Sequence, residues 1–336
     1  MTMEKQLIMS GMRPTGKLHI GHYLGVLKNW IELQKEYNCY FAIADLHALT
    51  TKFDKTEELK QNVLDVALDW LSCGIDPEIS TIYLQSLVPQ TAELHIYLSM
   101  ITPQNWVERD PTLKDMVKAM RIADNQTPDI SYGLLGYPVL MSADILTFNA
   151  DVVPVGVDQL AHLEITRDIA RRFNHIYKTD FFKEPKPKLT KTPLIKGLDG
   201  QKMGKSFNND IKISDSEDIT AKKIMKGLTD TNRLRRDDAG NPDNCGVIFP
   251  YYEIFADENL QNTIKTECKT AVYGCADCKK RLIEIVNEHF RPMREKRAEL
   301  SNNLDYVHKI IKEGSNKASE DAQKILDEVK TIIKMY

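Results

Sequence analysis

The sequence predicts an α/β fold, with a parallel β-sheet covered by helices in the first part of the chain and a smaller all-helical domain in the second. Two observations indicate this fold class. Short apolar runs alternate with amphipathic helical patterns over residues 1–206, whereas beyond Ser206 one helical pattern follows another. A length of 336 residues with 42% hydrophobic side chains is enough for two domains with buried cores.

The first part of the chain sets the order of the sheet elements. The expected elements are a strand at 7–9, a helix at about 22–37, a strand at 40–44, a helix at 57–71, strands at 81–85 and 152–155, and a helix at 158–173. Gly74 and Pro77 end the helix at 57–71. Strands that alternate with helices predict a parallel sheet, and such sheets bind ligands at the carboxyl ends of their strands.

The second part of the chain lacks strand patterns. The expected helices are 217–227, 280–290, 293–313 and 317–335. The connection at 237–250 is rich in Gly, Pro, Asn and Asp. We therefore divide the chain into three regions: 1–206, the helical 207–300, and C-terminal helices at 301–336 that pack back toward the first region.

Composition limits the partners of the protein. The chain has 45 basic and 48 acidic side chains, a net charge of −3, so no basic excess indicates a nucleic-acid partner. No run approaches the roughly 20 apolar residues of a membrane helix. The first residues lack the apolar region and cleavage site of a secretory signal. We expect a cytoplasmic protein with no membrane and no DNA as partner.

Two glycine-containing segments suggest phosphate binding. Residues 16–22, Gly-Lys-Leu-His-Ile-Gly-His, lie between the first strand and the first helix, where free backbone N–H groups attract anions. This segment lacks the G-x-G-x-x-G pattern, and a P-loop is excluded because His22 and Tyr23 stand where Lys and Ser/Thr are required. Residues 200–206 contain Gly-Lys-Ser with one residue too few before it. Alone, a His-x-x-His pair indicates surface chemistry or a partial metal site, and a lysine-rich loop is simply solvated.

Together, with a Rossmann-like pattern between them, the two segments resemble the signatures of class I aminoacyl-tRNA synthetases. His19-Ile20-Gly21-His22 reproduces the HIGH signature, and residues 202–206, Lys-Met-Gly-Lys-Ser, reproduce KMSKS with Gly204 in place of the usual Ser. The resemblance implies that His19, His22, Lys202 and Lys205 are catalytic. It also implies ATP, with Mg²⁺, as the substrate of this site. The implied ATP-binding residues are Arg13, Pro14, Thr15, Gly21, His22, Gly156, Val157, Asp158, Lys202, Met203, Gly204, Lys205 and Ser206.

Residues 137–146, Tyr-Pro-Val-Leu-Met-Ser-Ala-Asp-Ile-Leu, and residues 153–159 closely resemble tryptophanyl-tRNA synthetases of the bacterial type, and the resemblance covers nearly the whole chain. It implies that Asp144 accepts the indole N–H of tryptophan, in an apolar and polarisable pocket that selects one polar hydrogen. The implied tryptophan-binding residues are Asp144, Tyr137, Gln159, Met141, Met9 and His47. The implied partners are L-tryptophan, ATP, tRNA(Trp) and a second copy in a homodimer.

Several alternatives stand beside this interpretation. Taken alone, Asp144 could cap a turn, Tyr137 could belong to the core, and Met141 could fill a gap. Tyrosyl-tRNA synthetases share the class but typically use an additional Tyr near the first strand, and residues 7–11 contain none. A non-catalytic RNA-binding paralogue is a further alternative, which predicts the loss of signature residues that are all present here.

Six cysteines divide into two isolated residues and a group of four. Cys39 and Cys73 lie in apolar segments and are expected to be buried. The other four are separated by 22, 6 and 2 residues, and their number suits Zn²⁺ and an iron–sulfur cluster equally, with four unligated thiols as the alternative. Their spacing resembles a subset of tryptophanyl-tRNA synthetases, which implies a structural [4Fe–4S] cluster. The predicted ligands are Cys245, Cys268, Cys275 and Cys278.

The helical region is the expected reader of the tRNA anticodon, because sequence-specific RNA recognition favours exposed single-stranded bases. Arg233, Arg235 and Arg236 are candidates for this contact, although three arginines on a polar loop are more often only solvated.

Overall fold

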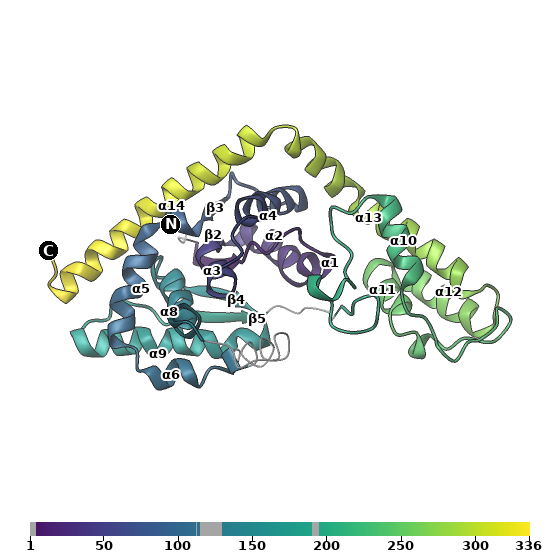
Figure 1. Cartoon of the computed structure of the whole chain (residues 1–336), viewed down its shortest axis with the longest axis horizontal. Helices are drawn as coiled ribbons and strands as arrows, with labels where there is room; N and C mark the ends of the chain where they lie inside the picture. Colours follow the sequence, from purple (N-terminus) through teal and green to yellow (C-terminus); the bar gives the residue numbers. More distant parts are fainter. Residues whose placement is uncertain (1–4, 112, 115–129, 190–194) are drawn as a thin grey trace.

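A five-stranded parallel sheet forms the centre of the computed structural model, which describes residues 5–111, 113–114, 130–189 and 195–336, apart from the side chains of residues 158 and 206 (Figure 1). Its order is β3-β2-β1-β4-β5, and every neighbouring pair is parallel. The strands are β1 (Leu7–Met12), β2 (Asn38–Ile43), β3 (Ser80–Leu84), β4 (Val152–Val155) and β5 (Lys186–Leu189). The predicted fold class is confirmed.

The central strand β1 has the chain's next two strands on one side and its last two on the other. Ile8 pairs with Cys39 of β2 and with Val152 of β4. The chain order reverses between β1 and β4, so the connections that follow these two strands diverge and leave a crevice at their carboxyl ends. This is the place where the sequence predicts the ligand site.

Helices cover both sides of this sheet and bury a tryptophan-rich core. Trp30 stacks on Phe41 with ring centroids 4.4 Å apart and meets Trp70 edge-on at 5.1 Å. Cys39 and Cys73 are buried, as predicted. The helices and helical turns are α1 (Ile20–His22), η1 (Tyr23–Leu27), α2 (Lys28–Glu36), α3 (Asp45–Lys52), α4 (Leu59–Cys73), η2 (Gln85–Leu87), α5 (Pro89–Ile101), α6 (Gln104–Glu108), α8 (Tyr132–Leu146), η3 (Val157–Gln159) and α9 (Leu160–Tyr177).

The second part of the described chain is helical, but the helices at Ile248–Phe255 and Glu258–Lys269 were not predicted, and the last two helices have other bounds than predicted. These elements are η4 (Lys205–Phe207), α10 (Glu217–Lys226), η5 (Pro242–Asn244), α11 (Ile248–Phe255), α12 (Glu258–Lys269), α13 (Cys275–Ser301) and α14 (Leu304–Ile333). Pro292 lies inside α13 and Gly314 inside α14, where helix ends were expected. Gly314 has a packing role instead: a Cβ atom there would lie 1.9 Å from the backbone oxygen of Ile82 in β3.

The long helix α14 runs from the helical region back across the sheet, where it passes β3 and reaches α5 (Figure 1). Ser315 Oγ accepts the backbone N–H of Leu84 at 3.0 Å, and Tyr40 Oη donates to Asp321 Oδ2 at 2.6 Å. The helix therefore covers the edge strand β3. Among the helices of the described residues, none is both long and apolar enough to cross a membrane.

Candidate active site and cysteine site

The His-x-x-His segment begins the short helix α1, directly after the turn that follows β1. His22 Nδ1 accepts the backbone N–H of His19 at 3.2 Å, and the two imidazole rings lie 3.8 Å apart. Gly21 is required here because a Cβ atom would lie 2.9 Å from the ring of His19. Burial lowers the pKa of His19 to about 4 and the pKa of His22 well below its ordinary value, so both rings are neutral at pH 7.

The segment that follows the lysine-rich loop pairs with this helix start. The backbone N–H of Ile20 donates to Ile211 O at 2.9 Å, and the N–H of Ile213 donates to Leu18 O at 3.0 Å. Lys205 Nζ donates to Gly16 O at 2.7 Å. Folding therefore brings together two signatures that lie far apart in the sequence.

The two lysines of the loop occupy different surroundings. Burial lowers the pKa of Lys205 to about 8, whereas Lys202 is exposed. Asn209, which the sequence analysis missed, shapes the loop: its Oδ1 accepts the N–H of Gly204 at 2.9 Å and its Nδ2 donates to Lys202 O at 3.1 Å. A Cβ atom at Gly197 would lie 2.3 Å from the Asn209 side chain. These contacts fix the shape of the loop at Lys202–Gly204.

A cavity of about 390 Å³ lies at the carboxyl ends of β1 and β4. All six predicted tryptophan-binding residues line it, together with three of the predicted ATP-binding residues, Arg13, His22 and Gly156: the six are Met9, His47, Tyr137, Met141, Asp144 and Gln159. Thr15 lies outside this lining but within 3.4 Å of Lys205 Nζ, Val157 is exposed, and Met203 is buried in the core. The predicted roles of the Asp158 and Ser206 side chains lie outside the described residues, and Pro14 does not line the cavity.

Asp144 is buried at the inner end of this cavity, and both of its oxygens have partners. His47 Nε2 lies 2.8 Å from Oδ2, and Gln85 Nε2 donates to Oδ1 at 2.7 Å. Gln85 Oε1 accepts the backbone N–H groups of Leu46 and His47 at 3.1 and 3.3 Å. Because His47 faces a carboxylate, its Nε2 carries the proton. Gln85 escaped the sequence analysis, and its only signal is its place at the end of a predicted strand.

A second polar network lies on the other wall of the cavity. Tyr137 Oη donates to Asp110 Oδ2 at 2.6 Å, and His162 Nε2 lies 2.8 Å from the same oxygen. His162 Nδ1 lies 2.9 Å from Gln159 Oε1. The predicted residues Tyr137 and Gln159 are thus joined through His162 and Asp110, which belong to none of the sequence motifs used.

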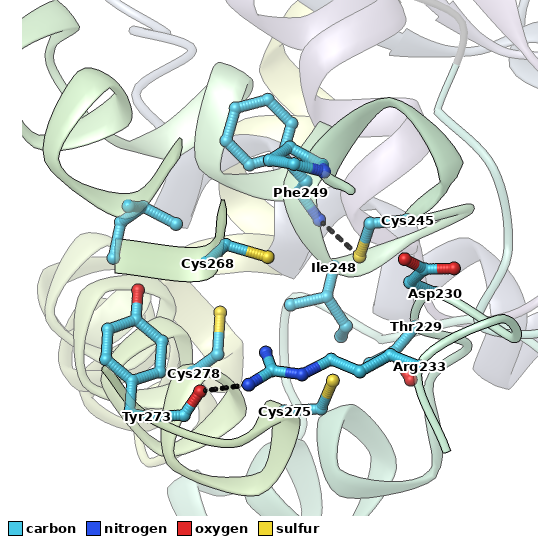
Figure 2. A pocket seen from close by; sticks show the side chains of 12 residues that line it. Thr229, Asp230, Arg233, Cys245, Ile248, Phe249, Cys268, Tyr273, Cys275 and Cys278 are labelled. Carbon is cyan, nitrogen blue, oxygen red and sulfur yellow. Dashed lines mark hydrogen bonds between the residues drawn. The ribbon is translucent and has the colours of Figure 1, made fainter. Parts of the chain in front are cut away.

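The four clustered cysteines line one small cavity of about 20 Å³, and Figure 2 shows their sulfur atoms directed toward a shared space. Cys245 precedes α11 and its Sγ accepts the N–H of Phe249 at 3.4 Å; Cys268 lies in α12, and Cys275 and Cys278 begin α13. Burial raises the pKa of Cys278 to about 12. Within the described residues, no group of three or more His, Cys, Asp or Glu side chains is arranged to hold a metal ion.

Arg233, a candidate for anticodon contact, is half-buried and lines the cavity of the cysteines. Its guanidinium donates to the backbone oxygens of Tyr273 and Arg236 at 2.7 and 2.6 Å (Figure 2). Arg235 and Arg236 have exposed side chains. Arg233 therefore supports the loop next to the cysteines.

The paired signatures, the parallel sheet and the cavity define a class I synthetase fold. The family model described as tRNA synthetases class I (W and Y) matches residues 2–291, and the chain belongs to this family. A structure of tyrosyl-tRNA synthetase complexed with L-tyrosine from Archaeoglobus fulgidus shares the fold, with a TM-score of 0.64 at 19% identity over 88% of this chain and 91% of that chain.

More similar proteins specify the amino acid. A tryptophan–tRNA ligase of Thermotoga maritima is 44% identical over 96% of this chain and 97% of its own length, and that of Aquifex aeolicus is 39% identical over 96% and 98%. The structure of tryptophanyl-tRNA synthetase from Campylobacter jejuni, complexed with ADP and tryptophan, has a TM-score of 0.89 at 36% identity and covers 98% of this chain and 100% of that chain. The predicted class of enzyme, a tryptophan–tRNA ligase, is confirmed.

Proposed function

We propose that the cavity at the carboxyl ends of β1 and β4 binds L-tryptophan and ATP and forms tryptophanyl-adenylate, from which the tryptophanyl group passes to the 2′-hydroxyl of the terminal adenosine of tRNA(Trp). The observation that carries this proposal is the arrangement around Asp144. Its carboxylate is held by His47 and Gln85 and faces a cavity lined by Met9 and Met141.

The indole ring of tryptophan suits this end of the cavity. Each oxygen of Asp144 has a second lone pair, so the carboxylate accepts an indole N–H without losing His47 or Gln85. The apolar methionines contact the ring face. Tyr137 and Gln159, on the opposite network, take the ammonium and carboxylate end of the amino acid.

ATP takes the part of the cavity next to α1. The tryptophan carboxylate attacks the α-phosphorus in line, an O–P bond forms, and the bond to the leaving pyrophosphate breaks. The neutral rings of His19 and His22 donate hydrogen bonds to the phosphates. Lys202 and Lys205 neutralise the negative charge that develops on pyrophosphate, which leaves with its Mg²⁺.

Amino-acid-dependent ATP–pyrophosphate exchange tests this proposal. We expect exchange with L-tryptophan and not with L-tyrosine, and we expect Asp144→Ala to lower kcat/KM for tryptophan by on the order of 100-fold because a buried hydrogen bond to a charged group is lost. Asp168→Ala, an exposed aspartate of α9, is the matched control and keeps normal exchange. Exchange driven by tyrosine would refute the pocket assignment, and no exchange with either amino acid would favour the non-catalytic paralogue.

The cysteines carry a second part of the proposal: we propose that Cys245, Cys268, Cys275 and Cys278 hold a [4Fe–4S] cluster, with Zn²⁺ as the alternative. Four thiols that converge on one cavity are a suitable donor set. The number of thiols suits both groups, so the shared cavity supports a metal site without choosing between them.

The cluster would link the loop before α11 to α12 and α13 as a structural staple. Iron, sulfide and zinc are measured in anaerobically purified protein. About four iron and four sulfide per chain are expected. One zinc per chain would support the alternative. If the protein contains neither iron nor zinc, the four thiols are free.

The domain division and the oligomeric state complete the proposal. We propose that residues 1–206 activate the amino acid, that 207–300 contact the anticodon, and that 301–336 connect back to the sheet. A homodimer is supported by exposed apolar side chains on or beside neighbouring helices: Phe53 directly after α3, Ile96 and Met100 of α5, and Tyr132 of α8. A cavity of about 370 Å³ between α3, α5 and α8 includes Phe53 in its lining, so a second copy has an apolar surface to bury.

A further inference from the structure

Two arginines near the end of α13 contact the segments that carry the two signatures. Arg294 and Arg297 lie one turn apart, and the same helix begins with Cys275 and Cys278 at the cysteine site. A single helix therefore extends from the cysteines to the neighbourhood of α1 (Figure 1). The contacts of the two arginines show what this helix does at its far end.

Arg297 is joined to the signature segment through one carboxylate of α4. Its Nε donates to Asp69 Oδ1 at 2.6 Å, and Asp69 Oδ2 accepts the backbone N–H of Leu18 at 2.7 Å. Leu18 directly precedes His19. The guanidinium also pairs with Asp65 at 2.5 Å. Asp69 is fully buried and Arg297 is 13% exposed, so water weakens these contacts very little.

Arg294 reaches the segment that follows the lysine-rich loop. Its Nη2 donates to Thr220 Oγ1 at 3.0 Å and its Nε to Ile213 O at 3.4 Å. The N–H of Ile213 in turn donates to Leu18 O. Both backbone groups of Leu18 are thus bound to partners of α13 arginines, the N–H through Asp69 and the carbonyl through Ile213.

We propose that Arg297 and Asp69 are positioning residues for adenylate formation. Arg297 of α13 orients Asp69, and Asp69 holds the backbone of Leu18, which fixes the position of His19. This inference rests on the proposed role of His19 at the ATP phosphates. Catalysis of phosphoryl transfer depends on placement, and a shift of about 1 Å costs on the order of 100-fold in rate.

The test measures adenylate formation in a single turnover, by rapid quench, together with the number of active sites from the burst amplitude. Arg297→Met is expected to lower the rate constant per active site by about 10- to 100-fold, while the Kd for tryptophan, from calorimetry, changes less than about twofold. Arg297→Lys retains a positive charge beside Asp69 and recovers part of the rate. The matched control is Arg291→Met on the same helix, whose exposed guanidinium pairs with Glu217 and which keeps the normal rate.

Two results would overturn the inference. One is a wild-type rate constant per active site in Arg297→Met. The other is a loss of burst amplitude at an unchanged rate constant, which a merely structural role produces. If Arg297→Met does not fold, the same rate constant is measured in Arg297→Lys and Asp69→Asn. Unchanged rate constants in both variants would also overturn the inference. A wild-type enzyme without tryptophan-dependent activation contradicts the proposed function instead, so the two failures are distinguishable.

Discussion

Asp144 is oriented by the protein before a ligand arrives. His47 and Gln85 each hold one oxygen, and Gln85 is itself held by two backbone N–H groups. The carboxylate therefore cannot rotate to meet a ligand of another shape, and its free lone pairs point in set directions. Selection of one indole N–H follows from this rigidity as much as from the charge.

Gln85→Met tests the rigidity of this carboxylate. The methionine is similar in size but removes the donor to Asp144 and the acceptor for Leu46 and His47. We expect KM for tryptophan to rise about tenfold, which corresponds to about 1.4 kcal/mol, within the range of one buried hydrogen bond. Gln104→Met, on the exposed surface of α6, is the control for the substitution. An unchanged KM would show that His47 alone orients Asp144.

The pKa of Lys205, lowered to about 8 by burial, predicts a pH dependence. Below pH 8 the ammonium is charged and attracts the phosphates; as pH rises through 8 the charge is lost. We expect kcat/KM for ATP, which reports groups of the free enzyme, to fall as pH rises above about 8. Lys205→Arg moves this fall to higher pH because a guanidinium keeps its proton. His19, with a pKa of about 4, adds no acidic limb above pH 5. A flat profile in the wild type up to pH 9 would contradict the assignment.

The sequence predicted the site residues that belong to motifs and missed those that support them. His22, Tyr137 and Asp144 were found because each lies in a segment with a recognisable pattern, and they do line one cavity. Gln85 and Asp69 belong to no pattern. They become visible only when folding brings strand β3 and helix α4 beside residues far away in the chain.

Among the secondary-structure elements, α14 shows how one glycine decides a helix contact. Gly314 was expected to end a helix, since glycine disfavours helical backbone. The structure shows an uninterrupted helix in which the missing side chain lets the backbone approach β3. The sequence pattern could not reveal this because propensity is local, whereas the approach to Ile82 depends on residues more than 200 positions apart.

Gly314→Ala is expected to destabilise the protein despite its better helix propensity. The new methyl group would overlap the Ile82 carbonyl, and overpacking of this kind costs about 1–3 kcal/mol. The thermal unfolding midpoint should fall by several degrees in calorimetry. Gly136→Ala, in helix α8, is the control: its Cβ would lie 3.9 Å from its nearest neighbour, so this midpoint stays the same or rises. Equal midpoints for both variants would refute the close approach.

Strand β5 was missed for an equally physical reason. Its sequence, Lys-Pro-Lys-Leu, has no apolar run and contains a proline, which sheets accept at edges. The lysines and the proline also discourage pairing with a strand from another molecule. An edge strand of this composition resembles a loop until its partner, β4, is known.

At the scale of the whole molecule, the homodimer is the main prediction still to be measured. Phe53→Asp combined with Met100→Asp puts charge into the exposed apolar surface of α3 and α5, so we expect a monomer at concentrations where the wild type sediments as a dimer. Leu234→Asp, at an exposed leucine outside these helices, leaves the sedimentation coefficient unchanged. A wild-type monomer, or a dimer that survives the double substitution, would contradict the proposed interface.

The position of α14 has a consequence for synthesis on the ribosome. The five strands, from β1 to β5, leave the exit tunnel well before residues 304–333, so the nascent sheet exists for a time with the edge of β3 bare. Its free N–H and carbonyl groups are then open to any passing strand. Ser315, whose Oγ accepts the N–H of Leu84, reaches that edge only after α14 has been synthesised, so a chaperone that shields β3 would act in this interval.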